Sequence, residues 1–428
     1  MDEVNRNRLE EFRQLRQGIR HSEEYLIVGI DIAKDRHHAF FGTATGKTLL
    51  RRLVFSNDHE GFRKLLDQAE ALRVQHGLKK VVYGMEPTAN YHKPLGEYLI
   101  RLGRTVVLVS GVTVKRNRES LDGRWDKHDT KDAANVADLI SQGKCLYYEY
   151  PSAELRGLRG LLSLKRRLKK QEHGYKVRIR NHLIAQYFPE MDRDYERLGT
   201  VGLSIVRWCF PASQITELDV EPFIQRVTSR RIRVETRRRL EEVWEKAGAS
   251  IGCEGVPGME HEAKVMVEGL RQIREVIKET KDKIEQLCEQ FPEYPYVLTI
   301  PGFGPDVSAK VLGAIGDPNR FQNGKQVLKM SGLDLSADRS GKDSDKAIPE
   351  ISKRGKGDLR YALYQAALIA SVQNREVMIY YTNKIRGRQR EKGIHVKMRV
   401  KLAAKLLVIA WTLMKKKEVF NPAYLNAG

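Results

Sequence analysis

Residues 25–56, YLIVGIDIAKDRHHAFFGTATGKTLLRRLVFS, carry a pattern of consecutive strands. Residues 25–33 are apolar and β-branched, interrupted by one acid, Asp31, which predicts a buried strand. Residues 37–44 and 47–56 predict two more strands, joined at the turn-forming residues GTATGK. Because short connections join antiparallel strands, this stretch predicts a three-stranded meander.

Helices and strands alternate after this meander. We expect helices over 57–77 and 90–103, strands over 79–88 and 104–111, a polar loop over 113–128, and a helix within KHDTKDAANVADLI (127–140). The order of three strands, helix, strand, helix, strand, helix is that of the ribonuclease H-like fold. The sequence therefore predicts a mixed sheet with helices packed on it.

Four acids fall at informative places in this order. Asp31 interrupts the first strand, Glu86 ends the fourth, and Asp129 and Asp132 lie one turn apart on the last helix. Taken alone, the two aspartates are more typical of a helix start. In a ribonuclease H-like sheet, however, the first and fourth strands are neighbours and the last helix packs beside them, so four carboxylates converge. Such a cluster suits Mg²⁺ or Mn²⁺, and two such ions can clamp a phosphodiester.

The chain is strongly basic. Its 428 residues carry 76 Lys and Arg against 55 Asp and Glu, a formal net charge of +21. Solvated surface charge is the simpler explanation, but the charges cluster: residues 155–183 hold ten basic residues and one acid, and residues 383–417 hold twelve and one. The clustering favours a nucleic-acid partner. The first cluster predicts a basic helix from about 152 to 187.

Other features limit the setting of the protein. The four cysteines are far apart and form no CxxC pair, which favours a reducing compartment, the cytoplasm. The charged N-terminus is unlike a signal peptide, and no stretch of about 18 apolar residues predicts a membrane span.

The second half of the chain predicts helices and one long loop. Residues at spacings of 4, 3, 4, 3, 4 and 3 form a heptad seam, which indicates a helix packed within the chain or a coiled coil within or between chains. These residues are Met266, Leu270, Ile273, Ile277, Thr280, Ile284 and Leu287. Residues 298–317, LTIPGFGPDVSAKVLGAIGD, resemble a helix–hairpin–helix. A Gly-rich polar loop follows over 331–360, and it contains Ser340.

Together these segments resemble the DEDD-type insertion-sequence transposases, also called bridge-RNA-guided recombinases. VGIDIAKDRH, YGMEPTANYH and KHDTKDAANVADLI resemble the three motif blocks of the family's RuvC-like domain. IPGFGPDVSAKVLGAIGDPNRF and SGLDLSADRSGKDSDKAIPEISKRGKGDLRYAL resemble its C-terminal transposase domain. The resemblance implies an N-terminal helix (1–24), a RuvC-like catalytic domain (25–150), a basic helical and coiled-coil region (151–290) and a helical transposase domain with a serine loop (291–428).

The resemblance also implies a mechanism and partners. The acids Asp31, Glu86, Asp129 and Asp132 would be the metal-binding tetrad, and Ser340 would be the nucleophile that forms a phosphoserine link to DNA. Family members act as multimers, so a homodimer or homotetramer is implied, with the carboxylates of one subunit meeting the serine of another. They use a structured noncoding RNA that pairs with donor and target DNA. The basic residues expected to contact nucleic acid are Lys165, Arg166, Arg167, Lys169, Lys170, Lys353, Arg354, Lys356 and Arg360.

The serine block departs from the family pattern. It reads Arg-Ser-Gly-Lys where the family often has Ser-Ser-Gly-Gly, and Lys356 replaces an Asn. Ser336 and Ser344 are therefore alternative nucleophiles. Two other functions stay open on the sequence: a RuvC-like nuclease that forms no covalent serine intermediate, and a non-enzymatic basic coiled-coil protein that binds nucleic acid.

Overall fold

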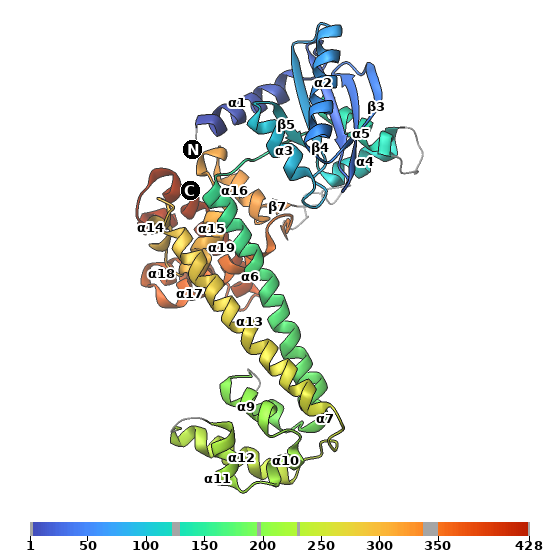
Figure 1. The fold of residues 1–428 in the computed structure, drawn as a ribbon. Helices are drawn as coiled ribbons and strands as arrows, with labels where there is room; N and C mark the ends of the chain where they lie inside the picture. Colours follow the sequence, from blue (N-terminus) through green and yellow to red (C-terminus); the bar gives the residue numbers. More distant parts are fainter. Residues whose placement is uncertain (1–2, 122–128, 195–197, 229–231, 337–349, 427–428) are drawn as a thin grey trace, which may run out of the picture. The chain divides into compact units, whose positions relative to one another are not determined.

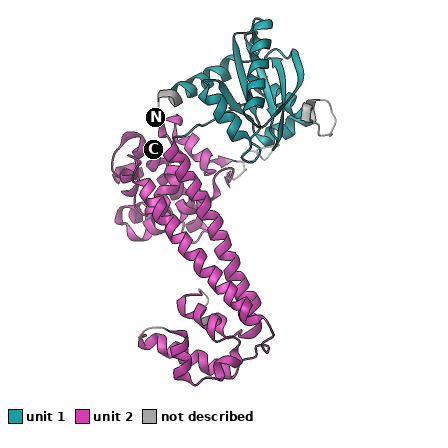
Figure 2. Ribbon diagram, in the orientation of Figure 1, with its two compact units in different colours: residues 1–151 teal, residues 152–428 magenta. Residues whose placement is uncertain are grey.

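The computed structural model describes residues 3–121, 129–194, 198–228, 232–336 and 350–426. The chain divides into two compact units, residues 1–151 and 152–428 (Figure 2).

The first unit is a six-stranded mixed sheet between two layers of helices (Figure 1). The strand order is β3-β2-β1-β4-β5-β6, with β1 antiparallel to β2 and parallel to β4. The elements are α1 (Glu3–Gly18), β1 (Tyr25–Asp31), β2 (Arg36–Thr43), β3 (Thr48–Ser56), α2 (His59–Gln75), β4 (Lys80–Met85), α3 (His92–Arg101), β5 (Thr105–Leu108), α4 (Gly111–Leu121), α5 (Asp129–Ser141) and β6 (Leu146–Tyr147). This confirms the mixed sheet expected from the sequence.

Each face of the sheet has its own apolar core, as strand alternation requires. Leu26, Val28 and Ile30 of β1 pack with α2 and α3, whereas Tyr25 and Ile27 pack with α1, α4 and α5. One expectation was wrong: residues 111–121 form helix α4, where a polar loop was predicted over 113–128. The segment VTVKRNRESL has little apolar periodicity, because Val114 is its main contribution to the core.

The second unit is built on two long antiparallel helices, α6 (Ala153–Arg178) and α13 (Met259–Cys288). Gly157 of α6 lies beside Leu287, and Tyr175 lies beside Gly269, which fixes the antiparallel direction. The predicted heptad helix therefore finds its partner within the same chain. Leu270, Ile277, Thr280 and Ile284 are buried as predicted, whereas Met266, Ile273 and Leu287 are only half-buried.

A helical core lies at each end of this pair (Figure 1). One end holds η1 (Ile179–Ile184), α7 (Ala185–Tyr187), α8 (Met191–Asp194), α9 (Thr200–Trp208), α10 (Ala212–Thr216), α11 (Val220–Val227) and α12 (Val234–Gly248). The other holds α14 (Tyr294–Leu298), α15 (Pro305–Ile315), η2 (Pro318–Arg320), α16 (Gly324–Ser331), β7 (Leu335–Ser336), β8 (Glu350–Ile351), α17 (Gly357–Gln373), α18 (Arg375–Ile385), α19 (Ile394–Lys416) and α20 (Ala423–Asn426).

The expected helix–hairpin–helix corresponds to α14, a glycine turn and α15. Gly302 in the turn has φ +81°, and a Cβ atom there would collide with the Ala366 carbonyl oxygen of α17. The glycine is thus required for packing against α17.

Candidate active site

Two glycines on neighbouring strands let α5 lie very close to the sheet. Gly29 of β1 and Gly84 of β4 are partners in the parallel register. A Cβ atom at Gly29 would collide with the Ala133 carbonyl oxygen, and one at Gly84 would collide with the Ile140 side chain. Only glycine leaves room for such an approach. The pair therefore sets the position of α5 over β1 and β4.

Strand alternation then places two of the predicted carboxylates on the side that α5 covers. Residues two positions apart on a strand face the same way, so Asp31 faces the same side as Gly29, and Glu86, just beyond β4, follows Gly84. The parallel register of the two strands runs to the pair Ile30–Met85. Asp31 and Glu86 are the next residue on each chain, so we expect them side by side at the usual spacing of neighbouring strands, about 5 Å. Both residues are half-buried.

The Glu86 carboxylate lies against the beginning of α4. A Cβ atom at Gly111, the first residue of that helix, would lie 2.5 Å from Glu86 Oε1. The carboxylate thus fills the space that a side chain at position 111 would take. Since α4 belongs to the same helical layer as α5, this contact agrees with the direction that strand alternation gives Glu86.

Asp132 is deeply buried and has a cationic partner. Its side chain is 6% exposed, and its Oδ1 lies 2.7 Å from Arg118 Nη2 of α4. An ionised carboxylate this deep in a protein needs such a partner. Arg118 lies in the segment predicted to be a loop, so sequence reasoning did not identify it.

A polar network fixes α4 against α5 next to this ion pair. Asn135 is fully buried and donates to the Val114 carbonyl oxygen at 2.8 Å. Asn117 Nδ2 lies 2.8 Å from Asn135 Oδ1 and 2.7 Å from Asp138 Oδ2. Asp138 of α5 therefore accepts a hydrogen bond from α4. The network fixes α4 relative to α5, and with them the positions of Arg118 and Asp132.

Asp129 is the first residue of α5, one turn before Asp132, and its side chain lies outside what the structure describes. Among the described side chains, no group of three or more His, Cys, Asp or Glu residues is close enough to hold a metal ion. The structure brings Asp31, Glu86 and α5 to one side of neighbouring strands. Carboxylates with few competing soft ligands suit Mg²⁺ or Mn²⁺, so the donor chemistry fits a hard divalent cation.

The adjacent histidines His37 and His38 have different surroundings. His37 is fully buried between Phe55 and Phe62, and burial lowers the pKa of its imidazole. It is a core residue. His38 is the register partner of Asp31 and so faces the same side of the sheet. Its Nε2 lies 3.4 Å from Arg52 Nη2.

A small hairpin closes the base of the serine loop in the second unit. Strands β7 and β8 pair antiparallel, with Leu335 opposite Ile351 and Ser336 opposite Glu350. Beyond them the Ser352 backbone N–H donates to the Asp334 carbonyl oxygen at 2.8 Å. The predicted nucleophile Ser340 and the alternative Ser344 lie outside the described residues, as does the side chain of Ser336.

Four of the predicted basic residues come together in one cavity of about 620 Å³: Lys165, Arg166, Lys169 and Lys356. The others are distributed differently. Arg167, Lys170, Lys353 and Arg354 are exposed. Arg360 is half-buried, and its Nη1 donates to the Ser331 carbonyl oxygen at 2.9 Å, so it supports the base of the serine loop.

Comparison with known proteins relates the chain to transposases. Residues 28–189 match a transposase family of the IS110 DEDD type, and residues 294–382 match the transposase IS116/IS110/IS902 family. The chain is 23% identical to an insertion element IS116 protein of Streptomyces clavuligerus, across 92% of this chain and 96% of that one. It is 24% identical to a probable family 20 transposase of Pseudomonas aeruginosa, across 86% and 94%. It is 22% identical to a pilin gene-inverting protein of Moraxella bovis, across 92% and 97%.

Within the part of the chain that the structure describes, no helix is both long and apolar enough to cross a membrane. All four cysteines are free thiols.

Proposed function

Because this chain belongs to the IS116/IS110/IS902 family of transposases, which are enzymes that cut and rejoin DNA, we propose that it does so with a carboxylate metal site and a serine nucleophile. The observation that carries the proposal is the Gly29–Gly84 pair. It seats the carboxylate-bearing helix α5 on the strand that ends in Asp31 and on the strand that Glu86 directly follows.

In this proposal, Asp31, Glu86, Asp129 and Asp132 hold Mg²⁺ or Mn²⁺. When bound, the cation neutralises charge on the phosphodiester that is cut. The chain itself supplies the rigid support: the glycine pair holds α5, and Arg118 and the Asn117–Asn135 network hold Asp132 in one orientation.

We further assign the nucleophile to Ser340. Its Oγ would bond to phosphorus, one deoxyribose oxygen would leave as a hydroxyl, and the proton released by serine balances the one that the leaving oxygen gains. One phosphodiester is exchanged for another, so the phosphoserine link can be resolved by a strand hydroxyl without ATP. The β7–β8 hairpin supports this assignment, because it closes a loop that contains Ser340.

The proposed partners follow from the same family relationship. They are the DNA of the element ends and of the target, a structured noncoding RNA, and further copies of this chain in a dimer or tetramer. The net charge of +21 is consistent with polyanionic partners, and the free thiols are consistent with a cytoplasmic setting.

The test is a trapping assay with the full chain, its element-end DNA, the adjacent noncoding RNA and Mg²⁺. A denaturing gel reports a covalent protein–DNA adduct. We expect the adduct to disappear in Ser340→Ala and in Asp31→Ala and to persist in Asp67→Asn, an exposed acid on α2. Ser344→Ala is a matched serine control.

Cleavage without an adduct, unchanged in Ser340→Ala, would replace this proposal with a metal-dependent nuclease. An adduct lost in Ser344→Ala and kept in Ser340→Ala would move the nucleophile to Ser344.

A further inference from the structure

A basic cavity of about 620 Å³ lies in the second unit between α6, α15 and the beginning of α17. Its volume is in the range of ligand-binding sites. Six cationic side chains, from α6, from α15 and from the residue before α17, line it: Arg159, Lys165, Arg166, Lys169, Lys310 and Lys356. These residues are far apart in sequence but line the same cavity. A basic helix whose charged side chains all faced solvent would not form such a cavity.

Three carboxylates hold some of these cations in place. Asp306 pairs with Lys165 and lies 2.8 Å from Lys310 Nζ, and Asp358 Oδ2 lies 3.4 Å from Arg166 Nη1. Glu172 Oε2 lies 2.8 Å from Lys169 Nζ. Six cations against three carboxylates leave the cavity positive. The ligand that this charge favours is an anion.

The wall of the cavity also has an aromatic and apolar part. Tyr361, one turn into α17, lines the cavity and is 66% exposed, which is high for a tyrosine. Leu162 and Ala314 provide apolar surface beside it. An unpaired nucleotide has a phosphate that cations can neutralise and a base that can stack on an aromatic ring. The cavity offers both, because an exposed ring lies next to cations that are held in place.

We propose that this cavity binds an unpaired nucleotide of a single nucleic-acid strand, with its phosphate among the cations and its base on the Tyr361 ring. In a duplex the base faces are already stacked, so the Tyr361 contact selects for a single strand. DNA and RNA strands share this chemistry, and the experiment below separates them. The proposal goes beyond the strand-transfer function and depends on neither the carboxylates of the first unit nor Ser340.

A different occupant has to be excluded by the test. Ile369 and Val372 of α17 are also exposed, at 44% and 65%. If an oligomer buried this face, Tyr361 would be part of an apolar contact with a second copy of the chain. In that case its removal changes the oligomeric state. A nucleotide site leaves the oligomeric state unchanged.

The experiment measures fluorescence anisotropy of labelled single-stranded DNA, single-stranded RNA and duplex DNA of one sequence with the full chain in EDTA. We expect Tyr361→Ala to weaken single-strand binding about tenfold, since stacking on an aromatic ring contributes about 1–3 kcal/mol per base. Duplex binding should change less than about twofold. Tyr361→Phe keeps the ring and should bind like the wild type, as should Trp208→Ala, which removes an exposed ring of α9. Light scattering of each variant reports the oligomeric state.

If Tyr361→Ala weakens binding of only the DNA strand or only the RNA strand, that strand is the ligand of the cavity. Either result supports the proposal. Equal weakening of single strands and duplex, no weakening at all, or a changed oligomeric state in Tyr361→Ala would overturn it. A second readout uses a strand carrying 5-iodouracil, which should cross-link to the peptide that contains Tyr361; cross-linking elsewhere only would also count against the site. The anisotropy assay contains no free divalent cation and measures binding alone, whereas the adduct assay depends on Mg²⁺ and Ser340. A negative result in one assay therefore does not imply a negative result in the other.

Discussion

At the scale of single residues, the pairing of Asp132 with Arg118 has the clearest consequence for function. Arg118 balances a charge that is buried in the helical layer. A divalent cation bound by Asp132 would share this carboxylate with Arg118. Removing one member of a buried ion pair is costly, because the other charge is left without compensation.

We therefore expect Arg118→Met to lower the free energy of unfolding of the first unit by about 3 kcal/mol. If Asp132 is a metal ligand, Mg²⁺ should raise the melting temperature of this variant more than that of the wild type, because the cation replaces the lost charge. Differential scanning fluorimetry with and without Mg²⁺ measures both effects. Arg101→Met, which breaks an exposed pair with Glu97, should have little effect. Equal Mg²⁺ responses in Arg118→Met and wild type would argue against Asp132 as a ligand.

Sequence reasoning located the acids but missed their neighbours. Asp31 and Glu86 could be placed because strand order and alternation are readable from short apolar runs. Arg118 could not, since its helix has few apolar residues and its partner is fixed only by tertiary packing. Nor could His38 be placed beside Asp31, because that register follows from the pairing of β1 with β2.

At the scale of secondary-structure elements, the contact of α5 with the sheet links fold to function. The sequence predicted five of the six strands, because each is an apolar run bounded by turn residues. It did not predict β6, which has two residues and forms only after the chain returns to β5. Nor did the sequence reveal why Gly29 and Gly84 are glycines, because that requires knowing what packs against them.

The two glycines should respond differently to substitution. Gly84→Ala meets the end of the Ile140 side chain, so it should destabilise the first unit by about 1–3 kcal/mol and be largely rescued by Ile140→Val. Gly29→Ala meets backbone at Ala133, and no side-chain change should rescue it. Thermal unfolding and adduct formation measure both effects.

Gly160→Ala is the matched control for this series, since a Cβ atom there meets nothing within 4 Å and should be tolerated. Failure of Ile140→Val to restore stability would mean that α5 does not depend on the close approach at Gly84.

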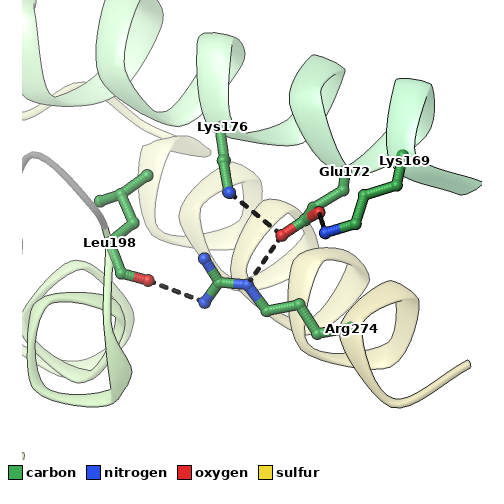
Figure 3. A network of polar contacts seen from close by, with 5 residues as sticks. All are labelled: Lys169, Glu172, Lys176, Leu198 and Arg274. Atoms are coloured by element: carbon green, nitrogen blue, oxygen red, sulfur yellow. Dashed lines mark hydrogen bonds and ion pairs between the residues drawn. The ribbon is translucent and has the colours of Figure 1, made fainter. Parts of the chain in front are cut away.

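The pairing of α6 with α13 contains a polar network around the buried carboxylate of Glu172 (Figure 3). Glu172 contacts Lys169 and Lys176 of its own helix and lies 3.4 Å from Arg274 Nε of α13. Arg274 also donates to the Leu198 carbonyl oxygen at 2.7 Å. Arg274 occupies a seam position four residues after Leu270, which explains why the predicted Ile273 is only half-buried there. A polar residue in a seam can specify register.

This network predicts a pH-dependent stability. Burial opposes the charge on Glu172, but hydrogen bonds from Lys169 and Lys176 lower the pKa of its carboxyl to about 2, from 4.5. Because the folded-state pKa is the lower one, the stabilisation is complete above about pH 4.5 and is lost as pH falls towards 2. We expect Glu172→Gln to cost about 2–3 kcal/mol at neutral pH and progressively less in acid.

Melting temperatures of Glu172→Gln and wild type from pH 7 down to pH 3 test this dependence, with exposed Glu279→Gln of α13 as the control. A constant difference between Glu172→Gln and wild type across that range would show that the carboxylate charge does not stabilise the helix pair.

At the scale of the whole molecule, the proposed catalytic groups are divided between two compact units. The four acids belong to residues 1–151 and Ser340 to residues 152–428. The proposed mechanism therefore requires the carboxylates of a first unit and the serine of a second unit, which can come from the same chain or from two chains. Family resemblance favours two chains, and a mixing experiment distinguishes the arrangements.

We expect Asp31→Ala and Ser340→Ala each to be inactive alone and to regain activity when they are coexpressed. In a mixed oligomer, a site between chains can combine the intact carboxylates of the Ser340→Ala subunit with the intact serine of the Asp31→Ala subunit. A site within one chain always lacks one group, so mixing would restore nothing. The trapping assay measures the outcome, and the adduct should form only on the Asp31→Ala subunit, which a size tag identifies on the gel. A mixture of Asp31→Ala with Glu86→Gln is the control, because both subunits lack a carboxylate and neither arrangement can restore the site.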